Sequence, residues 1–321
     1  RTLRSECRYQ KYLRYALVFS QGEKNISVTG PGTLNGNAQR GGELGEFEDK
    51  GGTLHNRPCL LWFEECEHIQ VKDITYTNAA GWTETYSRCR NIHVNNITVK
   101  ENYFFNADGC NMVDSDYFII ENCDIDTHDD GICLKGYTQR GCRNGIIRNN
   151  RVRSICNAIK MGTDSSGGFR NIRIENNEIW ETGISGIALE IADGGVMENI
   201  TVQNTTMKVL ATPIFIMLSN RNRPVYGQLT VPNGAIRNVY IEGIEATVDK
   251  YKTYHQAERK HFDFIPYASS ISGFPGHPIE HIVIENVNIL VKGGFPIRNA
   301  ESALREIPEA GRPDGIGWQL C

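Results

Sequence analysis

Short stretches in which isoleucine or valine alternates with polar residues recur along the chain. Three of them read NIHVNNITVK from Asn91, NIRIENNEIW from Asn171 and HIVIENVNIL from His281. Alternation with a period of two is typical of a strand that buries one face, whereas a helix repeats its apolar residues every three or four positions. The sequence therefore predicts strands that begin at residues 25, 68, 91, 117, 144, 171, 199, 238 and 281.

The spacing of these strands predicts how they stack. Their starts lie 43, 23, 26, 27, 27, 28, 39 and 43 residues apart. An interval of 23 to 28 residues fits one turn of a parallel β-solenoid, and a longer one fits a turn with an inserted loop. Leucine-rich repeats have a similar length, but the sequence lacks their leucine lattice. We predict an all-β fold, a single-stranded right-handed parallel β-helix of roughly nine or ten coils, as one domain over residues 1–321 with its repeats in about 25–294.

The composition narrows the functional classes. The 321 residues are 40% hydrophobic and carry a net charge of −4, so the chain can bury a large core. A pI near 6.1 gives no basic surface for a nucleic acid, and no apolar run reaches the roughly 18 residues of a membrane span. We therefore expect neither a nucleic acid nor a membrane as a partner, and we expect a monomer.

Ten cysteines raise the question of disulfides or metal ligands. A chain of this size does not need bridges as its main support. Cys66, Cys89 and Cys142 each lie two residues before the same point of the repeat, where equivalent side chains stack inside a solenoid. The sequence shows no C-x-x-C spacing, which is common in zinc sites. We favour buried free thiols, which pack as small hydrophobes.

A second strand follows the first in several coils and aligns them by a small residue. With Gly109, Gly131, Ala158 and Gly186 in register, apolar side chains form an inward ladder suited to a buried parallel sheet. The outward residues form three rows, which are Asp108, Asp130, Asn157 and Ser185; Asn111, Cys133, Lys160 and Ala188; and Val113, Lys135, Gly162 and Glu190.

The first row predicts that three carboxylates converge. Asp108 and Asp130 become neighbours roughly 5 Å apart at the backbone, with Asp129 beside them at the strand entrance. Carboxylates so close repel one another, so one of them should keep its proton to unusually high pH and provide an acid beside a base. A solvated acidic edge or a calcium site is the alternative, because Asp124 and Asp126 also lie nearby. Spacing alone favours neither interpretation.

These motifs resemble those of the polygalacturonase family, glycoside hydrolase family 28. NADG at 106–109 is similar to the family's N-T-D motif, HDDG at 128–131 to its D-D motif, and NISVTGPGTLNG to its entry coil. The similarity runs from about Asn25 to about Gly294. It implies a right-handed parallel β-helix that hydrolyses pectin with inversion. It also implies that Asp129 is the general acid, while Asp108 and Asp130 hold and activate the attacking water.

Two motifs depart from the family pattern. Where the family has G-H-G, this chain has CNA, so Asn157 replaces a histidine and is expected to bind substrate. Where the family has R-I-K, it has ALE, so Ala188 and Glu190 replace the two cations that grip a galacturonate carboxylate. Either Lys160 takes over the carboxylate, or Glu190 accepts hydrogen bonds from a neutral sugar. From the sequence we favour the lysine, since an ammonium group one coil away can still reach an acidic group.

Other residues are candidates with simpler alternatives. Lys135 and Lys160 share the outward face and could either contact a sugar carboxylate or neutralise the aspartates. His128 precedes the Asp pair and could tune it or bind substrate, although a turn histidine exposed to water is the simpler interpretation. Trp82 and Tyr86 could stack on a sugar ring, or they could cover the core.

We conclude from the sequence that the chain is an inverting glycosidase acting on a pectic or related acidic polysaccharide or oligosaccharide. A polysaccharide lyase is one alternative; it would need calcium and a basic residue such as Lys160. A non-catalytic carbohydrate-binding solenoid is another. The leading interpretation requires no cofactor and no metal. The resemblance implies an extracellular or periplasmic protein, although the N-terminal RTLRSECRYQ lacks the apolar segment of a signal peptide.

Overall fold

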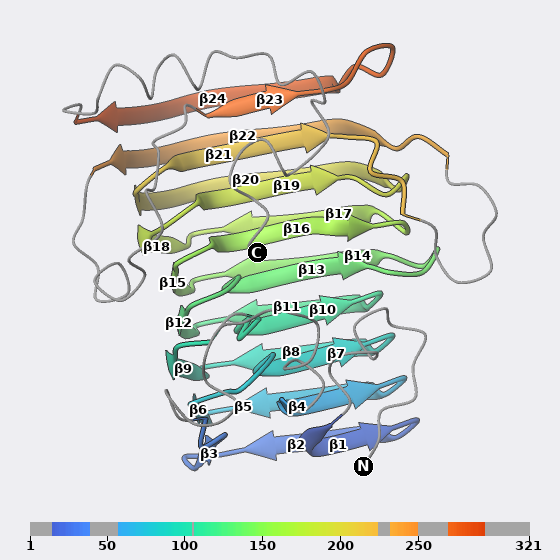
Figure 1. The fold of residues 1–321 in the computed structure, drawn as a ribbon, viewed down its shortest axis with the longest axis vertical. Coiled ribbons are helices and arrows are strands. Elements are labelled where there is room, and N and C mark those ends of the chain that lie inside the picture. The colour runs from blue at the N-terminus through green and yellow to red at the C-terminus, as the bar shows by residue number, and fades with distance from the viewer. Residues whose placement is uncertain (1–14, 39–56, 105, 224–231, 250–268, 293–321) are drawn as a thin grey trace.

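The computed structural model describes residues 15–38, 57–104, 106–223, 232–249 and 269–292. Every regular element in these ranges is a β-strand. The strands stack in chain order along the long axis of the molecule, from β1 at the bottom to β24 at the top (Figure 1). The prediction of an all-β, right-handed single-stranded parallel β-helix is confirmed.

One face of the solenoid is a nine-stranded sheet, and all its neighbouring strands are parallel. Each strand comes from a different coil, so the sheet has nine coils in the described residues. Its strands, in spatial order, are β1 (Ala16–Gln21), β4 (Cys59–Glu64), β7 (Glu84–Ser87), β10 (Cys110–Val113), β13 (Ile132–Gly136), β16 (Asn157–Ser165), β19 (Ser185–Ile191), β21 (Thr212–Leu218) and β23 (Ser270–Ser272).

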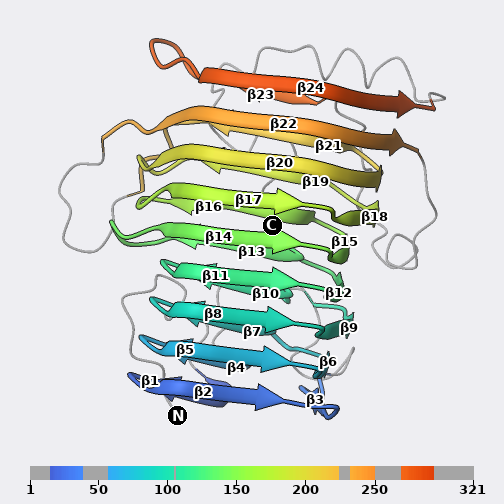
Figure 2. The same ribbon diagram turned by 180° about the vertical axis from the view of Figure 1, so that it is seen from behind.

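The other two faces join into one fifteen-stranded sheet. Its longest row of strands faces the viewer in Figure 2, where the molecule is turned by 180°. They join because β20, β22 and β24 are long enough to run through both faces, and β20 pairs with both β17 and β18. The second face holds β2 (Lys24–Thr29), β5 (Glu67–Lys72), β8 (Arg90–Asn95), β11 (Asp116–Glu121), β14 (Cys142–Arg148), β17 (Phe169–Glu175), β20 (Val196–Val209), β22 (Ala235–Val248) and β24 (Glu280–Val291). The third adds β3 (Thr33–Asn35), β6 (Thr75–Thr77), β9 (Thr98–Asn102), β12 (Asp124–Thr127), β15 (Arg151–Ser154) and β18 (Glu178–Thr182).

The residue that opens each predicted repeat forms a corner of the solenoid. All nine have φ between 52° and 58°, in the left-handed region that asparagine tolerates better than most residues. The amide of Asn171 donates to the side chain of Asn144, and the amide of Asn199 donates to that of Asn171, both at 3.1 Å. Asn144, Asn171 and Asn199 therefore occupy equivalent points of successive coils, as the spacing predicted.

The interior is a continuous apolar column of isoleucine, valine, leucine and aromatic side chains. Cys66, Cys89 and Cys142 belong to it, and the backbone N–H of Cys66 lies 3.4 Å from the sulfur of Cys89. Seven described cysteines are buried free thiols, which agrees with the prediction. Cys156 is the exception, because it takes part in a disulfide.

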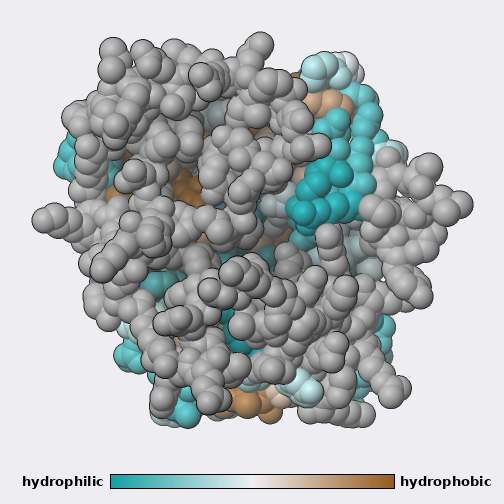
Figure 3. All heavy atoms as spheres, in the orientation of Figure 1, coloured by the Kyte–Doolittle hydropathy of each residue, from teal (hydrophilic) through white to brown (hydrophobic). Residues whose placement is uncertain are grey.

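At its N-terminal end, the described stack extends slightly beyond the predicted repeats. β1 precedes Asn25 and pairs with β4, with Ala16 opposite Cys59, because it belongs to the nine-stranded face rather than to the repeated theme. Large apolar side chains are exposed at both ends, among them Leu17 and Leu290, and brown surface is visible at the lower end in Figure 3. Residues 1–14 and 293–321, which include the predicted terminal segments, lie outside the described residues. Within the described ranges, no helix is long and apolar enough to cross a membrane.

Candidate active site

The outward rows predicted from the sequence are present on the nine-stranded sheet. In the second row, Asn111 lies opposite Cys133, Cys133 opposite Lys160, and Lys160 opposite Ala188. The first row is continuous too, because the N–H of Gly109 donates to the carbonyl of Asp130 at 3.0 Å and the next coil repeats this bond.

The third row is only partly as predicted. Val113 lies opposite Lys135. After Leu134, however, the register between β13 and β16 shifts, so that Gly136 lies opposite Ser165. Lys135 therefore does not pair with Gly162 in the ladder. Such a bulge re-aims the side chains beside it, and a count of alternating residues could not show it.

Glycine follows the aspartates because the coils approach one another closely there. A Cβ on Gly109 would lie 2.5 Å from the carbonyl oxygen of Gly131, and a Cβ on Gly131 would lie 2.6 Å from the carbonyl oxygen of Ala158. Any side chain at either position would push neighbouring coils apart. The repeated Asp-Gly motif thus brings the carboxylates of adjacent coils to the same level.

Two of the three carboxylates are each paired with a lysine. Asp108 lies 3.1 Å from the Nζ of Lys135, and Asp130 lies 3.2 Å from the Nζ of Lys160. The amide of Asn157 also donates to Asp130, at 2.7 Å. All five residues are at most 7% exposed. Lys135, Lys160 and Asn157, predicted to bind substrate, therefore contact the carboxylates themselves.

Asp129 is held in a different way. Its carboxylate accepts hydrogen bonds from the backbone N–H of Asn106 at 2.7 Å and of Asp130 at 2.9 Å. Burial and the charge of Asp130 raise the pKa of Asp129 despite these bonds and the charge of Lys160. Asp129 is thus suited to keep a proton.

The other two carboxyls are each paired with a lysine, but their pKa values are shifted in opposite directions. Burial alone would raise the pKa of Asp130, but the charges of Lys160 and Lys135 and the bond from Asn157 lower it. Burial raises the pKa of Asp108 to about 7, and the charges of Asp129 and Asp130 add to the rise that Lys135 opposes. The cluster therefore combines an ionised carboxylate with a protonated one, as the sequence led us to expect.

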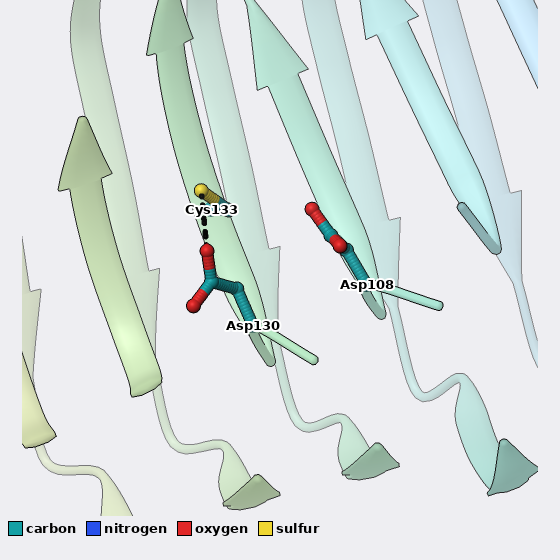
Figure 4. A group of neighbouring side chains, drawn as sticks. All are labelled: Asp108, Asp130 and Cys133. Atoms are coloured by element: carbon teal, nitrogen blue, oxygen red, sulfur yellow. Dashed lines mark hydrogen bonds between the residues drawn. The ribbon is translucent and has the colours of Figure 1, made fainter. Parts of the chain in front are cut away.

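Asp108, Asp130 and Cys133 also form a group of possible metal ligands. Their ligand atoms lie within 4.8 Å of one another, and their side chains share one side of neighbouring strands (Figure 4). Lys135 places its ammonium 3.1 Å from both Asp108 and the sulfur of Cys133, and Lys160 is paired with Asp130. A divalent cation would have to displace or repel both ammonium groups. The donor set therefore fits lysines better than a metal, which also argues against the calcium interpretation.

Two tryptophans extend the cluster toward the N-terminal coils. Trp82 stacks on Trp62 with ring centroids 5.9 Å apart, and Nζ of Lys135 lies 4.9 Å from the centre of the Trp82 ring. Trp82 is 1% exposed, so it covers Lys135 instead of offering a sugar platform. Tyr86 points into the core against Phe63. The interpretation of Trp82 and Tyr86 as sugar-stacking residues is therefore wrong.

The remaining predicted residues are also buried. His128 is 1% exposed and meets the Tyr103 ring edge-on at 5.4 Å, so it is not a turn histidine in water. Glu190 is 1% exposed and accepts a hydrogen bond from the hydroxyl of Thr163 at 2.9 Å. Sequence reasoning missed Thr163 and Trp62. Extending the second row two coils toward the N-terminus would have reached Trp62, since it lies opposite Thr85, which lies opposite Asn111.

Comparison with known sequences finds a family model that matches residues 4–263, the model of the glycosyl hydrolases family 28. Polygalacturonase-2 of Solanum lycopersicum is 23% identical over 282 residues, which cover 85% of this chain and 57% of the relative. Exopolygalacturonase B of Aspergillus niger is 25% identical over 222 residues, covering 65% of this chain and 50% of the relative. The chain thus spans about half the length of these curated relatives.

Solved structures show the same fold. The hyperthermoactive exopolygalacturonase from Thermotoga maritima matches with a TM-score of 0.68 and 20% identity, covering 87% of this chain and 69% of that one. The endo-xylogalacturonan hydrolase from Aspergillus tubingensis matches with a TM-score of 0.60 and 14% identity, covering 88% and 74%. Identities this low carry the solenoid architecture and leave the substrate to be argued from the site.

Proposed function

We propose that this chain, which belongs to the glycosyl hydrolases family 28, is an inverting glycoside hydrolase. Its substrate would be a pectic or related acidic polysaccharide or oligosaccharide, as the names of the polygalacturonase relatives suggest. The observation that carries the proposal is that the three buried carboxyls have pKa values shifted in different directions. Glycosidic hydrolysis needs an acid and a base side by side.

The geometry supports a role for each aspartate. Asp129, whose pKa is raised, gives its proton to the glycosidic oxygen as the bond from that oxygen to the anomeric carbon breaks. A water held between Asp108 and Asp130 attacks the anomeric carbon from the opposite side, and its proton passes to one of these carboxylates. Asp130 is the better acceptor, since its lowered pKa keeps it ionised. The carboxylate oxygens of Asp108 and Asp130 lie within 4.8 Å, close enough to share one water.

The lyase alternative finds less support. It would need a basic residue to remove a proton from the sugar, and Lys160 was the candidate. Although burial alone lowers it, the pKa of Lys160 is raised by the charges of Asp130 and Glu190, so the ammonium holds its proton tightly. Such a lysine is a poor general base.

The alternative of a non-catalytic carbohydrate-binding solenoid does not explain why the fold buries these charged groups at a cost in free energy. Buried carboxylates and ammonium groups stabilise a fold little, since pairing barely repays their desolvation. Groups arranged with separated pKa values are more typical of catalysis. We further propose that the protein acts as a monomer on polysaccharide outside the cytoplasm.

The proposal is tested by following the anomeric protons of the first product by NMR during hydrolysis of oligogalacturonides and of pectin. Inverted configuration is expected. Retained configuration would contradict the assigned roles, and ultraviolet absorbance of unsaturated products would identify a lyase. Asp129→Asn serves as the inactive control, and Glu178→Gln, at an exposed strand position of the third face, as the active one.

A further inference from the structure

Cys133 occupies the middle of the buried charge cluster. It faces outward from β13 and is completely buried. Its sulfur accepts a hydrogen bond from Nζ of Lys135 at 3.1 Å, and its S–H lies 3.5 Å from Oδ2 of Asp130 (Figure 4). Because Lys135 is also paired with Asp108 at 3.1 Å, the cysteine connects the two carboxylates proposed to hold the attacking water.

The sulfur of Cys133 is a thiol in this setting and not a thiolate. Burial raises the pKa of the thiol well above its ordinary value, and the charge of Asp130 adds to the rise that Lys135 opposes. The sulfur therefore keeps one proton, which it can direct toward only one acceptor at a time.

Two acceptors lie at the same distance from this donor. The sulfur of Cys133 is 3.5 Å from Oδ2 of Asp130 and 3.5 Å from the carbonyl oxygen of Gly162. Gly162 lies between Met161 and Ser165, where the register of β16 with β13 shifts. The hydrogen can turn about the Cβ–Sγ bond from one acceptor to the other while the heavy atoms stay in place. Since a hydrogen bond to an ionised acceptor is about twice as strong as one to a neutral acceptor, the charge of Asp130 decides its direction.

We propose that Cys133 is a positioning residue for Asp130, and that its S–H points to this carboxylate while it is ionised and to the Gly162 carbonyl once it is protonated. The inference rests on the proposed function, in which Asp130 accepts the proton of the attacking water. Before that transfer, the thiol and Lys160 both engage Oδ2 of Asp130. After it, the thiol donates to Gly162, so it keeps a partner although it is buried, and no proton leaves the sulfur.

Infrared spectroscopy tests the change of acceptor without relying on catalysis. The S–H stretch absorbs in a region free of other strong protein bands, and the difference from a Cys133→Ala spectrum isolates the band of Cys133 from those of the other cysteines. Asp130→Asn removes the charged acceptor, so in this background the band should lie at higher frequency than in the wild type. Asp126→Asn, at a partly exposed position of β12, should leave it in place. The same frequency in Asp130→Asn and the wild type would overturn the inference.

Kinetics test whether the hydrogen bond serves the reaction. In Cys133→Ala the donor to Asp130 is lost, so kcat on oligogalacturonides should fall at least about fivefold with little change in KM. The acidic limb of kcat/KM should move upward by about half a pH unit. Cys133→Ser should restore kcat and return the limb to the wild-type position or below it, because a hydroxyl is a stronger donor than a thiol.

A buried thiol elsewhere provides the matched control. Cys123 is 2% exposed and donates to the carbonyl of Glu121 at 3.1 Å, so Cys123→Ala should change neither kcat nor the acidic limb. Equal kcat and equal pH profiles in Cys133→Ala and Cys133→Ser would show that the side chain only fills space, and would overturn the inference. A wild type that hydrolyses no pectic substrate, with a Cys133 band that still shifts as expected, would overturn the proposed function and leave the change of acceptor supported.

Discussion

Two faces of the same solenoid carry ion pairs of similar length and very different surroundings. On the nine-stranded sheet, Lys160 and Asp130 lie 3.2 Å apart, and each side chain is 3% exposed. On the fifteen-stranded sheet, Arg237 and Glu198 lie 2.8 Å apart, and their side chains are 45% and 22% exposed. Although Arg237 and Glu198 lie closer together, their pair should stabilise the fold less, because water screens the two charges. Distance alone therefore does not rank these pairs; desolvation does.

The exposed pairs follow the repeat. Arg170 and Arg237 flank Glu198 from the coils on either side, at 2.7 and 2.8 Å. These pairs place opposite charges next to one another on successive coils, and they lower the pKa of Glu198 without bringing it toward neutral pH. The buried pairs instead leave one carboxyl protonated and another ionised, which is a chemical difference between neighbouring aspartates.

Removing the buried acid should have the largest effect. In Asp129→Asn the proton donor is lost, and we expect kcat to fall about 10² to 10⁴-fold, since general acid catalysis contributes that much. The measurement is the initial rate of reducing-end release, with thermal unfolding as the check on the fold. Asp126→Asn, at a partly exposed position of β12, is the matched control. A rate within threefold of the wild type would remove Asp129 from the mechanism.

A buried carboxyl inside the coil should affect stability instead. Burial raises the pKa of Glu84 from 4.5 to about 7, only partly opposed by Cys110, Tyr76 and Tyr86. The folded state therefore binds more protons than the unfolded state between these pH values, so the free energy of unfolding falls as pH rises from 4.5 to about 7, by about 3 kcal/mol.

Glu84→Gln should remove the contribution of Glu84 to the pH dependence of stability and make the protein more stable than the wild type at pH 8. Urea unfolding at pH 4, 6 and 8 measures the difference. Glu178→Gln at the surface should leave the wild-type curve unchanged. Parallel curves for Glu84→Gln and the wild type would show that Glu84 does not titrate in this range.

Removing the cation of the buried Lys160–Asp130 pair should shift the pH dependence of kcat/KM. Lys160 lowers the pKa of Asp130, which must be ionised to accept a proton. In Lys160→Met that pKa rises, so activity is lost at higher pH as the solution is acidified. We expect the acidic limb of kcat/KM to shift upward by about one unit. Lys72→Met, at a surface pair with Asp73, should cause no shift.

The smallest effect is expected on the exposed ladder. Arg237→Ala removes one partner of Glu198 and should lower the free energy of unfolding by about 0.5 kcal/mol or less, and less again in high salt. Denaturant titrations at low and high ionic strength measure it. A loss of several kcal/mol would contradict the contrast between the two faces.

The sequence predicted the coils and the first two outward rows because period-two alternation and a fixed residue count per turn are local properties. It placed Asp108 and Asp130 side by side for the same reason. It did not reveal the register shift after Leu134, which depends on how two coils meet.

The direction of some side chains was the second feature that the sequence did not predict correctly. Tyr86 alternates as an inward residue, but its hydroxyl made it look like a surface aromatic. The pairing of Lys160 with Asp130 could be reached only from three-dimensional distances, since both a sugar contact and an aspartate contact were consistent with its row.

The asparagine corners have a consequence for how such a chain can change in length. Each of these corners donates one side-chain amide hydrogen bond to the corner of the preceding coil, so the junctions between Asn144, Asn171, Asn199 and Asn238 are nearly identical. A coil duplicated at one of these joints would find a matching surface on both sides. The aspartates occupy only two adjacent coils. Tandem duplication elsewhere would therefore lengthen the track along which a polymer lies and leave the bond-breaking chemistry untouched, which gives this architecture a modular route to new chain-length preferences.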